Sequence, residues 1–237
     1  GQFEWGTLDL RVFDQDTRHA MDMGDDRFFY GFGMPMDSES TNRGAHSKAS
    51  IELSERHTLG VGGEYLTYRL DDWWSPVGAS GSMCCEKFWN VRDGEQGRLG
   101  VYGEWQASWS PQWLSLVGAR VDRISSNAGD VQGYNDSMAM WSADAAAFNA
   151  RDHRRADTHV DVAALLRYVP SQMLTFEGGY ARKTRSPNLY ERYAWSTSAM
   201  AALMNNFVGD GNGYIGRVDL EPETAHSVSA SGELHDA

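Results

Sequence analysis

Histidine and methionine side chains recur at two-residue spacing near the start of the chain, and they are the residues best suited to chemistry. The run 19–23 reads HAMDM, and the run 34–36 reads MPM. Residues two apart project to the same side of an extended chain. Imidazole and thioether donors form a soft ligand set that favours copper, above all Cu(I), over magnesium or calcium. The spacing predicts a metal site at His19, Met21 and Met23, with Met34 and Met36 as possible further ligands.

Methionine is concentrated in the polar segments between the predicted strands. Met138 and Met140 repeat the two-residue spacing, and Met200 and Met204 would share one face of a short helix. Among the predicted strands only one contains a methionine, Met173. Methionine also fills irregular gaps beneath loops, and a single H-x-M step often occurs by chance. The packing interpretation therefore stays open beside the metal site.

The two cysteines, Cys84 and Cys85, are adjacent in the sequence. A disulfide between neighbours has strained geometry, so we expect these residues to be free, paired elsewhere or facing a metal. No C-x-x-C pair is present, and a structural zinc site is not expected.

Several function classes find no support in the sequence. It contains no G-x-S-x-G, H-E-x-x-H, P-loop or dinucleotide-binding motif, so we predict neither an enzyme with catalytic residues nor a required cofactor. The net charge of −12 argues against a nucleic-acid partner, because nucleic acids select basic surfaces.

Alternation of apolar and polar residues predicts an all-β fold. The segment 98–109 is clearest, because Leu99, Val101 and Trp105 share one side while Arg98 and Glu104 share the other. A bulge near residue 6 would bring the first strand into phase, and an alanine-rich run predicts a short helix near 141–149. We expect eight strands, at about 3–13, 47–56, 58–69, 98–109, 113–124, 157–168, 173–182 and 224–235.

The connections between these strands alternate in length. Short turns near 56–57, 110–112 and 169–172 separate long polar segments, of which the first three are 14–44, 70–97 and 125–156. Long loops at one end and short turns at the other are typical of an outer-membrane barrel, whereas a soluble β-sandwich has no reason to sort its loops so. No stretch approaches the roughly 20 apolar residues of a transmembrane helix.

The apolar faces and the tryptophans predict how this sheet meets a membrane. In a barrel with a wet lumen the apolar face contacts lipid and the charged face points inward. Trp105, Trp109 and Trp113 gather around one short turn, and Tyr168 lies near another. Amphipathic rings prefer the headgroup layer, so these side chains predict an aromatic girdle at the short-turn end.

Two motifs flank the last long segment. The run 185–193 reads RSPNLYERY, and 219–223 reads DLEPE. Together they resemble TonB-dependent outer-membrane receptors, which carry R-x-P-N-L-x-E after one strand and L-x-P-E before the next. The resemblance implies structural roles for the motif residues. From their charges and spacing we also expect a loop-anchoring ion pair of Glu191 with Arg192, with Arg185 nearby. The matching positions are Arg185, Pro187, Asn188, Tyr190, Glu191, Pro222 and Glu223.

The resemblance also implies the rest of the assembly. Such receptors close about 22 strands around an N-terminal plug, with short periplasmic turns and long extracellular loops. We therefore expect residues 1–237 to be an internal part of the barrel domain, without the plug. The implied location is the outer membrane of a Gram-negative bacterium. The implied partners are TonB, acting through the plug, outer-membrane lipid and lipopolysaccharide, and a metal ion or metallophore.

The chain is most similar to the copper-linked branch of these receptors, where an H-x-M step near an extracellular strand end supplies ligands. His19 and Met21 match that step, whereas Met23 and the cysteines fall outside it. We therefore expect uptake of copper ion or a copper complex. One alternative is a siderophore or other metallophore receptor with aromatic loop residues stacking on the ligand, and another is a small structural or adhesive barrel without transport. The aromatic candidates are Trp73, Trp74, Tyr190 and Trp195.

Overall fold

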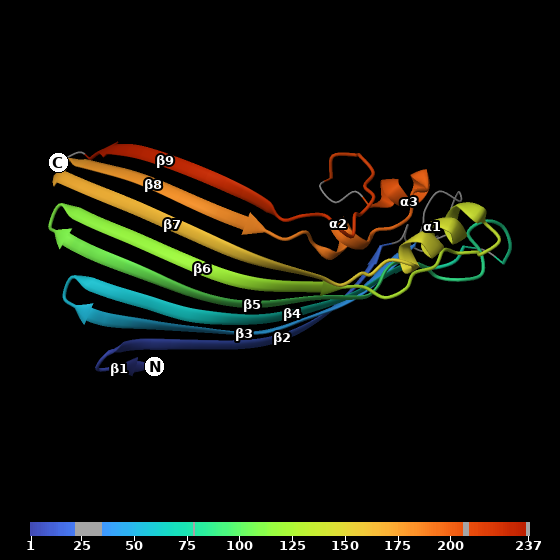
Figure 1. Cartoon of the computed structure of the whole chain (residues 1–237), viewed down its shortest axis with the longest axis horizontal. Helices are drawn as coiled ribbons and strands as arrows, with labels where there is room; N and C mark the ends of the chain where they lie inside the picture. The colour runs from blue at the N-terminus through green and yellow to red at the C-terminus, as the bar shows by residue number, and fades with distance from the viewer. Residues whose placement is uncertain (22–34, 78, 206–208, 236–237) are drawn as a thin grey trace.

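Nine strands form a single antiparallel sheet in which each strand pairs with its neighbours in chain order (Figure 1). The computed structural model describes residues 1–21, 35–77, 79–205 and 209–235. The strands are β1 (Gln2–Phe3), β2 (Gly6–Met21), β3 (Met36–Ser54), β4 (His57–Trp74), β5 (Phe88–Ser110), β6 (Trp113–Asn127), β7 (Arg155–Ser171), β8 (Leu174–Arg185) and β9 (Glu223–Leu234). The helices are α1 (Ala139–Asn149), α2 (Leu189–Tyr193) and α3 (Ala199–Met204). None of the helices in these ranges is long and apolar enough to cross a membrane.

Short and long connections lie at opposite ends of the sheet, which confirms the predicted alternation. Residues 55–56, 111–112 and 172–173 form the short turns, and we call this the turn end. The long loops L2 (75–87), L3 (128–154) and L4 (186–222) lie at the other end, the loop end, where β2 ends and β3 begins on either side of residues 22–34, which lie outside the described residues. In Figure 1 the N-terminus and the C-terminal end of β9 lie at the turn end, and α1, α2 and α3 lie at the loop end.

One face of the sheet, the outer face, is an exposed apolar band. Directly opposed residues share a face, and Val101 of β5 opposes Val121 of β6, both exposed. Trp113 stacks on Tyr168 at the turn end, with ring centroids 4.3 Å apart. Along β5 the band runs from Leu99 to Trp109, and ten steps of about 3.3 Å at a tilt of about 40° give about 25 Å. That height matches the hydrocarbon-facing band of a membrane barrel.

The opposite face, the inner face, carries charge. Arg120 donates to Asp122 at 2.6 Å and to Glu64 at 2.5 Å, and Arg98 donates to Asp122 at 2.9 Å. Gly100 leaves the space for this cluster, because a Cβ there would collide with the Asp122 carboxylate and the Arg120 guanidinium. Apolar outside and charged inside is the arrangement expected of a barrel wall with a wet lumen.

Strands β2 to β5 extend further toward the loop end than predicted. The range 70–97 was expected to be a loop, but β4 continues to Trp74 and β5 begins at Phe88. The range 14–44 was expected to be a loop, but β2 continues to Met21 and β3 begins at Met36. Their ladder is bordered by polar pairs, such as Thr41 Oγ1 donating to Asp16 at 2.8 Å. Both faces of the sheet are polar at this height, so hydropathy alternation ends before the strands do. The prediction that Met173 is the one methionine within a strand was also wrong, because residue 173 lies in the turn between β7 and β8.

The first predicted strand is two strands. A turn at residues 4–5 separates β1 from β2, so the sheet has nine strands where eight were expected. Gly6 has φ +143, a value that L side chains rarely adopt, and a Cβ there would collide with the Ser50 carbonyl. The phase change near Gly6 is therefore a hairpin turn and not a bulge.

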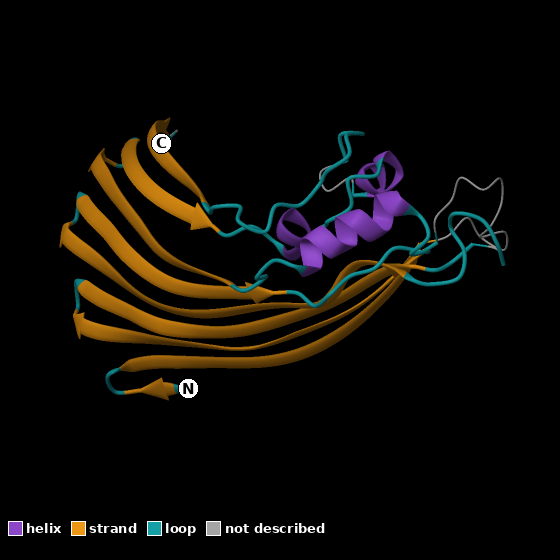
Figure 2. Cartoon of the chain, turned by 45° about the vertical axis from the view of Figure 1, so that its right-hand side comes forward, coloured by secondary structure: helices purple, strands orange, loops and turns teal. Residues whose placement is uncertain are grey.

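The loops fold back over the inner face and build the main apolar core at the loop end (Figure 2). The predicted helix near 141–149 is confirmed as α1, which buries Trp141, Ala145 and Phe148 along one side. Phe88, at the start of β5, stacks on Trp74 with centroids 4.5 Å apart and on Trp195 of L4 at 5.0 Å. The sheet is thus one layer at the turn end and is covered by loops at the loop end.

Candidate functional site

His19 and Met21 lie in the last three residues of β2, inside the strand and not beyond it. The register places His19 opposite Ser38 and Met21 opposite Met36. Alternation along β2 puts both side chains on the inner face, because Val12 and Leu10 of the same strand belong to the outer apolar band. The two predicted ligands therefore share one face, and Met36 joins them from β3.

The row that contains Met21 leads directly into the loop core. Met36 opposes Trp74 of β4, and Trp74 opposes Phe88 of β5. Met36 packs against the core cluster, whereas Met21 remains 44% exposed. Two thioethers thus adjoin across β2 and β3, where directly opposed Cα atoms lie about 4.5–5.5 Å apart. This pair of soft donors, with His19 one row away, is the feature that a soft metal ion would recognise.

The row that contains His19 reaches a buried carboxylate. Ser38 opposes Asp72, a fully buried residue on the part of β4 that lies above the apolar band. Burial raises the pKa of Asp72 to about 6, because desolvation penalises the charged form. Hydrogen bonds from Asn90 and Tyr190 and the charge of His19 partly offset this shift by favouring the ionised form.

Asp72 also connects the strand wall to L4. Asn90 Nδ2 lies 2.8 Å from Asp72 Oδ2 and 2.8 Å from Asn205 Oδ1, and Asn205 Nδ2 donates back to Asn90 Oδ1 at 3.2 Å. Asn205 is the C-cap residue that follows α3. All three side chains are buried, so this chain of hydrogen bonds holds the end of α3 against β5 and β4.

The motif residues of L4 form a compact anchor at its base. Arg185 contacts both oxygens of Glu191 at 2.8 and 3.0 Å, and it also pairs with Glu223 at the start of β9. Asn188 caps α2 in a capping box with Glu191. The Arg185 guanidinium lowers the pKa of Glu191 below its usual range. The expected partner of Glu191 was Arg192 with Arg185 nearby, and Arg185 supplies the contacts.

Arg192 serves a different connection, which sequence reasoning missed. Its guanidinium donates to Ser126 Oγ at 2.7 Å, to Asp157 Oδ2 at 2.8 Å and to the Leu220 carbonyl at 3.1 Å. The neighbouring Tyr193 hydroxyl donates to the His153 carbonyl at 2.8 Å, and burial raises the pKa of this tyrosine. L4 is therefore fixed to β6 and β7 by a fully covered arginine, and to L3 by the neighbouring tyrosine.

The expectation for the cysteines was wrong, because Cys84 and Cys85 are bonded to each other. Cys85 has φ +94, and this uncommon backbone conformation accompanies the bond between neighbours. Cys84 is buried in L2. Disulfides are typical of oxidising compartments outside the cytosol, and bonded sulfurs are not thiolate ligands for a metal.

The remaining candidate residues are scattered. Met23 and Met34 lie outside the described residues. Met138 packs against the loop core, whereas Met140 is 50% exposed. Trp74 is buried in that core, and Lys87 Nζ lies 4.3 Å from the ring centroid of Trp73. Within the described ranges, no three His, Cys, Asp or Glu side chains gather closely enough to hold a metal ion.

An antiparallel meander with sorted loops, an apolar outer face and a charged inner face defines part of the wall of a membrane β-barrel. Residues 2–237 match the family described as TonB dependent receptor-like, beta-barrel. The chain belongs to this family, whose members reside in the outer membrane. No curated protein sequence matches it.

Solved structures with the same fold include receptors for different metals. The structure titled "Copper transporter OprC" is 14% identical with a TM-score of 0.70, covering 99% of this chain and 34% of its own. An FrpB iron transporter from Neisseria meningitidis (F3-3 variant) is 15% identical, with a TM-score of 0.53 and coverages of 77% and 26%. Its F5-1 apoprotein is 13% identical, with a TM-score of 0.59 and coverages of 97% and 32%. The chain spans about a third of the OprC chain, and these identities establish the fold alone.

Proposed function

We propose that this chain forms the wall and extracellular loops of a TonB-dependent importer for copper ion or a copper complex. His19 and Met21 would bind the metal at the loop end of the lumen, with Met36 as the third soft donor. The observation that carries the proposal is their register, because one imidazole and two thioethers share the inner face of two paired strands. The structural likeness to a copper transporter supports the same cargo.

An organic metal chelate is the alternative cargo, and the likeness to FrpB iron transporters keeps it under test. Stacking on such a ligand needs accessible aromatic rings. Trp74 and Trp195 are buried in the loop core, and Tyr190 packs against it. Three of the four aromatic residues named from the sequence are thus covered, which leaves this alternative with less support than the His and Met pair gives copper. Membership of a receptor family weighs against a purely structural or adhesive barrel.

The test is Cu(I) binding to the intact receptor that carries this chain, purified in detergent under reducing, anaerobic conditions. We expect stoichiometric binding that is lost in a His19→Ala/Met21→Ala double variant. A matched control is Gln15→Ala/Thr17→Ala, which alters the same face of the same strand at the next two inward positions. That control should keep the affinity of the unaltered receptor.

Three further results decide the interpretation. Equal Cu(I) affinity in the His19/Met21 variant and its control would reject the site. Binding of Zn²⁺ with equal affinity would reject soft-donor selectivity. If the receptor supports growth on an iron chelate and not on limiting copper, the metallophore alternative replaces the copper proposal.

A further inference from the structure

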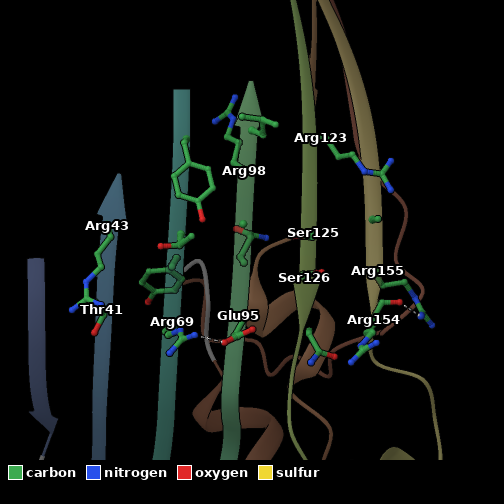
Figure 3. A pocket seen from close by; sticks show the side chains of 18 residues that line it. Thr41, Arg43, Arg69, Glu95, Arg98, Arg123, Ser125, Ser126, Arg154 and Arg155 are labelled. Carbon is green, nitrogen blue, oxygen red and sulfur yellow. Dashed lines mark hydrogen bonds and ion pairs between the residues drawn. The ribbon is translucent and has the colours of Figure 1, made fainter. Parts of the chain in front are cut away.

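A cavity of about 970 Å³ crosses the outer face from β3 to β7, and its lining is unsuited to a metal ion (Figure 3). The lining includes Arg43, Arg69 and Arg123 but no histidine, cysteine or methionine. Guanidinium groups repel a cation, and the soft donors that Cu(I) prefers are missing from this cavity. Sulfur atoms lie instead in segments such as L2, which contains two adjacent cysteines.

The disulfide of L2 differs from an ordinary structural staple. Cys84 and Cys85 are bonded to each other at a sequence separation of 1. A disulfide stabilises a protein mainly by restricting the unfolded chain, and the restriction grows with the length of the loop that the bond closes. A bond between neighbours closes almost no loop. It therefore contributes little to the stability of the barrel, and what it offers is the chemistry of two adjacent sulfur atoms.

The two cysteines differ in their access to solvent and in their contacts. Cys84 is 3% exposed, whereas Cys85 is exposed. Asn135 Nδ2 of L3 lies 3.9 Å from Cys84 Sγ. The orientation of that amide is fixed, because Asn135 Oδ1 accepts from the backbone N–H and the hydroxyl of Ser137 at 2.9 and 2.7 Å. The amide thus directs a donor at Cys84, and a donor of this kind favours the thiolate form of a cysteine.

Backbone contacts hold this part of L2 against L3 without the help of the disulfide. The Glu86 N–H donates to the Tyr134 carbonyl at 3.1 Å, and the Trp89 N–H donates to the Gln132 carbonyl at 3.0 Å. Cys85 has φ +94, a conformation that side chains of L residues rarely adopt. Opening the bond would therefore free the backbone of Cys85, while the contacts that follow it keep the cysteine pair beside L3.

We infer that Cys84 and Cys85 form a thiol-gated site for Cu(I), closed while the bond is intact and open after reduction by a low-molecular-weight thiol. A thiolate attacks the sulfur of the exposed Cys85, the S–S bond breaks, and its electron pair leaves on Cys84 beside Asn135. A second thiol releases Cys85 from the mixed disulfide. Two small thiols are thereby oxidised to one small disulfide, and the cysteine pair gains two electrons and two protons. Both thiolates then bind Cu(I), and the two protons are released.

This site is separate from His19 and Met21 and does not depend on what the receptor imports. The imidazole and thioether donors of β2 and β3 bind a metal without any redox step, whereas the cysteine pair has no thiolate until its bond is opened. A thiol that carries Cu(I) in solution would supply both the electrons and the metal. The chemistry of L2 therefore suits a thiolate complex of Cu(I) as the source of the ion.

The test counts the Cu(I) bound by the intact receptor in detergent, under anaerobic conditions, before and after treatment with glutathione and its removal by gel filtration. Ascorbate keeps copper as Cu(I) without opening disulfides, so the untreated receptor reports every other site. We expect iodoacetamide to label Cys84 and Cys85 only after glutathione, and the treated receptor to bind one further Cu(I) per chain. A Cys84→Ser/Cys85→Ser variant should lack this increment. Phenylarsine oxide, which bridges two neighbouring thiols, should abolish it in the unaltered receptor.

The matched control is the His19→Ala/Met21→Ala variant, which should keep the glutathione-dependent increment. Four outcomes would overturn the inference: cysteines that stay unlabelled after glutathione, labelling without any added Cu(I), an increment that survives in the serine variant or after phenylarsine oxide, and an increment that disappears in the His19/Met21 variant. If the untreated receptor binds no Cu(I) but the treated receptor binds one, the site proposed on β2 and β3 fails and the thiol-gated site stands.

Discussion

Replacing Arg192 by methionine should release L4 from the barrel wall while leaving the barrel folded. Arg192 is 2% exposed and bridges β6, β7 and the far end of L4 through three hydrogen bonds. Methionine keeps most of the aliphatic volume but removes the charge and all donors. The Asp157 carboxylate, whose side chain is only 14% exposed, would then lose its cationic partner.

The size of the effect follows from these contacts. Breaking a buried ion pair by removing one partner costs about 3–5 kcal/mol. Asp157 keeps one hydrogen bond, from Ser186 Oγ at 2.8 Å, which places the expected cost at the lower end of that range, about 3 kcal/mol. At about 1.4 kcal/mol per tenfold change, the docked state of L4 should open roughly 100-fold more often.

Amide hydrogen exchange of residues 188–204 in the folded receptor measures this opening directly. The Arg192 and Ala194 amides are suitable reporters, because each bonds to a carbonyl within the α2 segment. The control is Arg217→Met, since that arginine belongs to the same loop but pairs with Asp219 at an exposed position, where loss of the ion pair should change the exchange little. If both variants exchange at the rate of the unaltered protein, Arg192 does not hold the loop.

Two other perturbations test the faces and the buried carboxylate. Val117→Arg places a charge in the middle of the outer band, opposite Trp105, and should cost about 2–4 kcal/mol in denaturant unfolding from lipid vesicles, whereas Gln106→Arg on the inner face should cost far less. The raised pKa of Asp72 means that ionisation opposes docking. The docked state of α3 should therefore lose stability as the pH rises from about 4 to about 6 and change little above that. Asp72→Asn should abolish this dependence in hydrogen exchange corrected for its intrinsic pH effect.

The fold could be predicted where the sheet faces two different solvents. Between Leu99 and Trp109 one side of β5 meets an apolar phase and the other meets charge, so the sequence alternates visibly. Residues 14–21 and 36–44 form equally regular ladders, but both of their faces are polar. The hydropathy of the sequence does not alternate in these two segments. The predicted end of β2 therefore came too early, and the predicted start of β3 too late. The predictable part of the fold is thus the part that contacts lipid.

The candidate ligands could be predicted by residue type, but their surroundings could not. His19 and Met21 stand out as soft donors at a fixed spacing, which is a local signal. The contacts that hold the loops near them join residues far apart in the chain, such as Asn90 with Asn205 across 115 positions and Arg192 with Asp157 across 35. No local pattern distinguishes these side chains from ordinary polar loop residues. The bond between Cys84 and Cys85 depends in the same way on a backbone conformation set by the loop.

The strand register places the candidate ligands in the same rows as side chains that contact L4. Met21 belongs to the row that ends at Phe88, on which Trp195 of L4 stacks, and the row of His19 reaches Asp72, which holds α3 through Asn90. A ligand bound at these two rows would therefore act on side chains that also dock L4. Loss of Cu(I) binding in the His19/Met21 variant identifies a metal ligand only if the amide hydrogen exchange of residues 188–204 is unchanged in that variant. Arg192→Met supplies the converse case, because it frees the loop without altering either row.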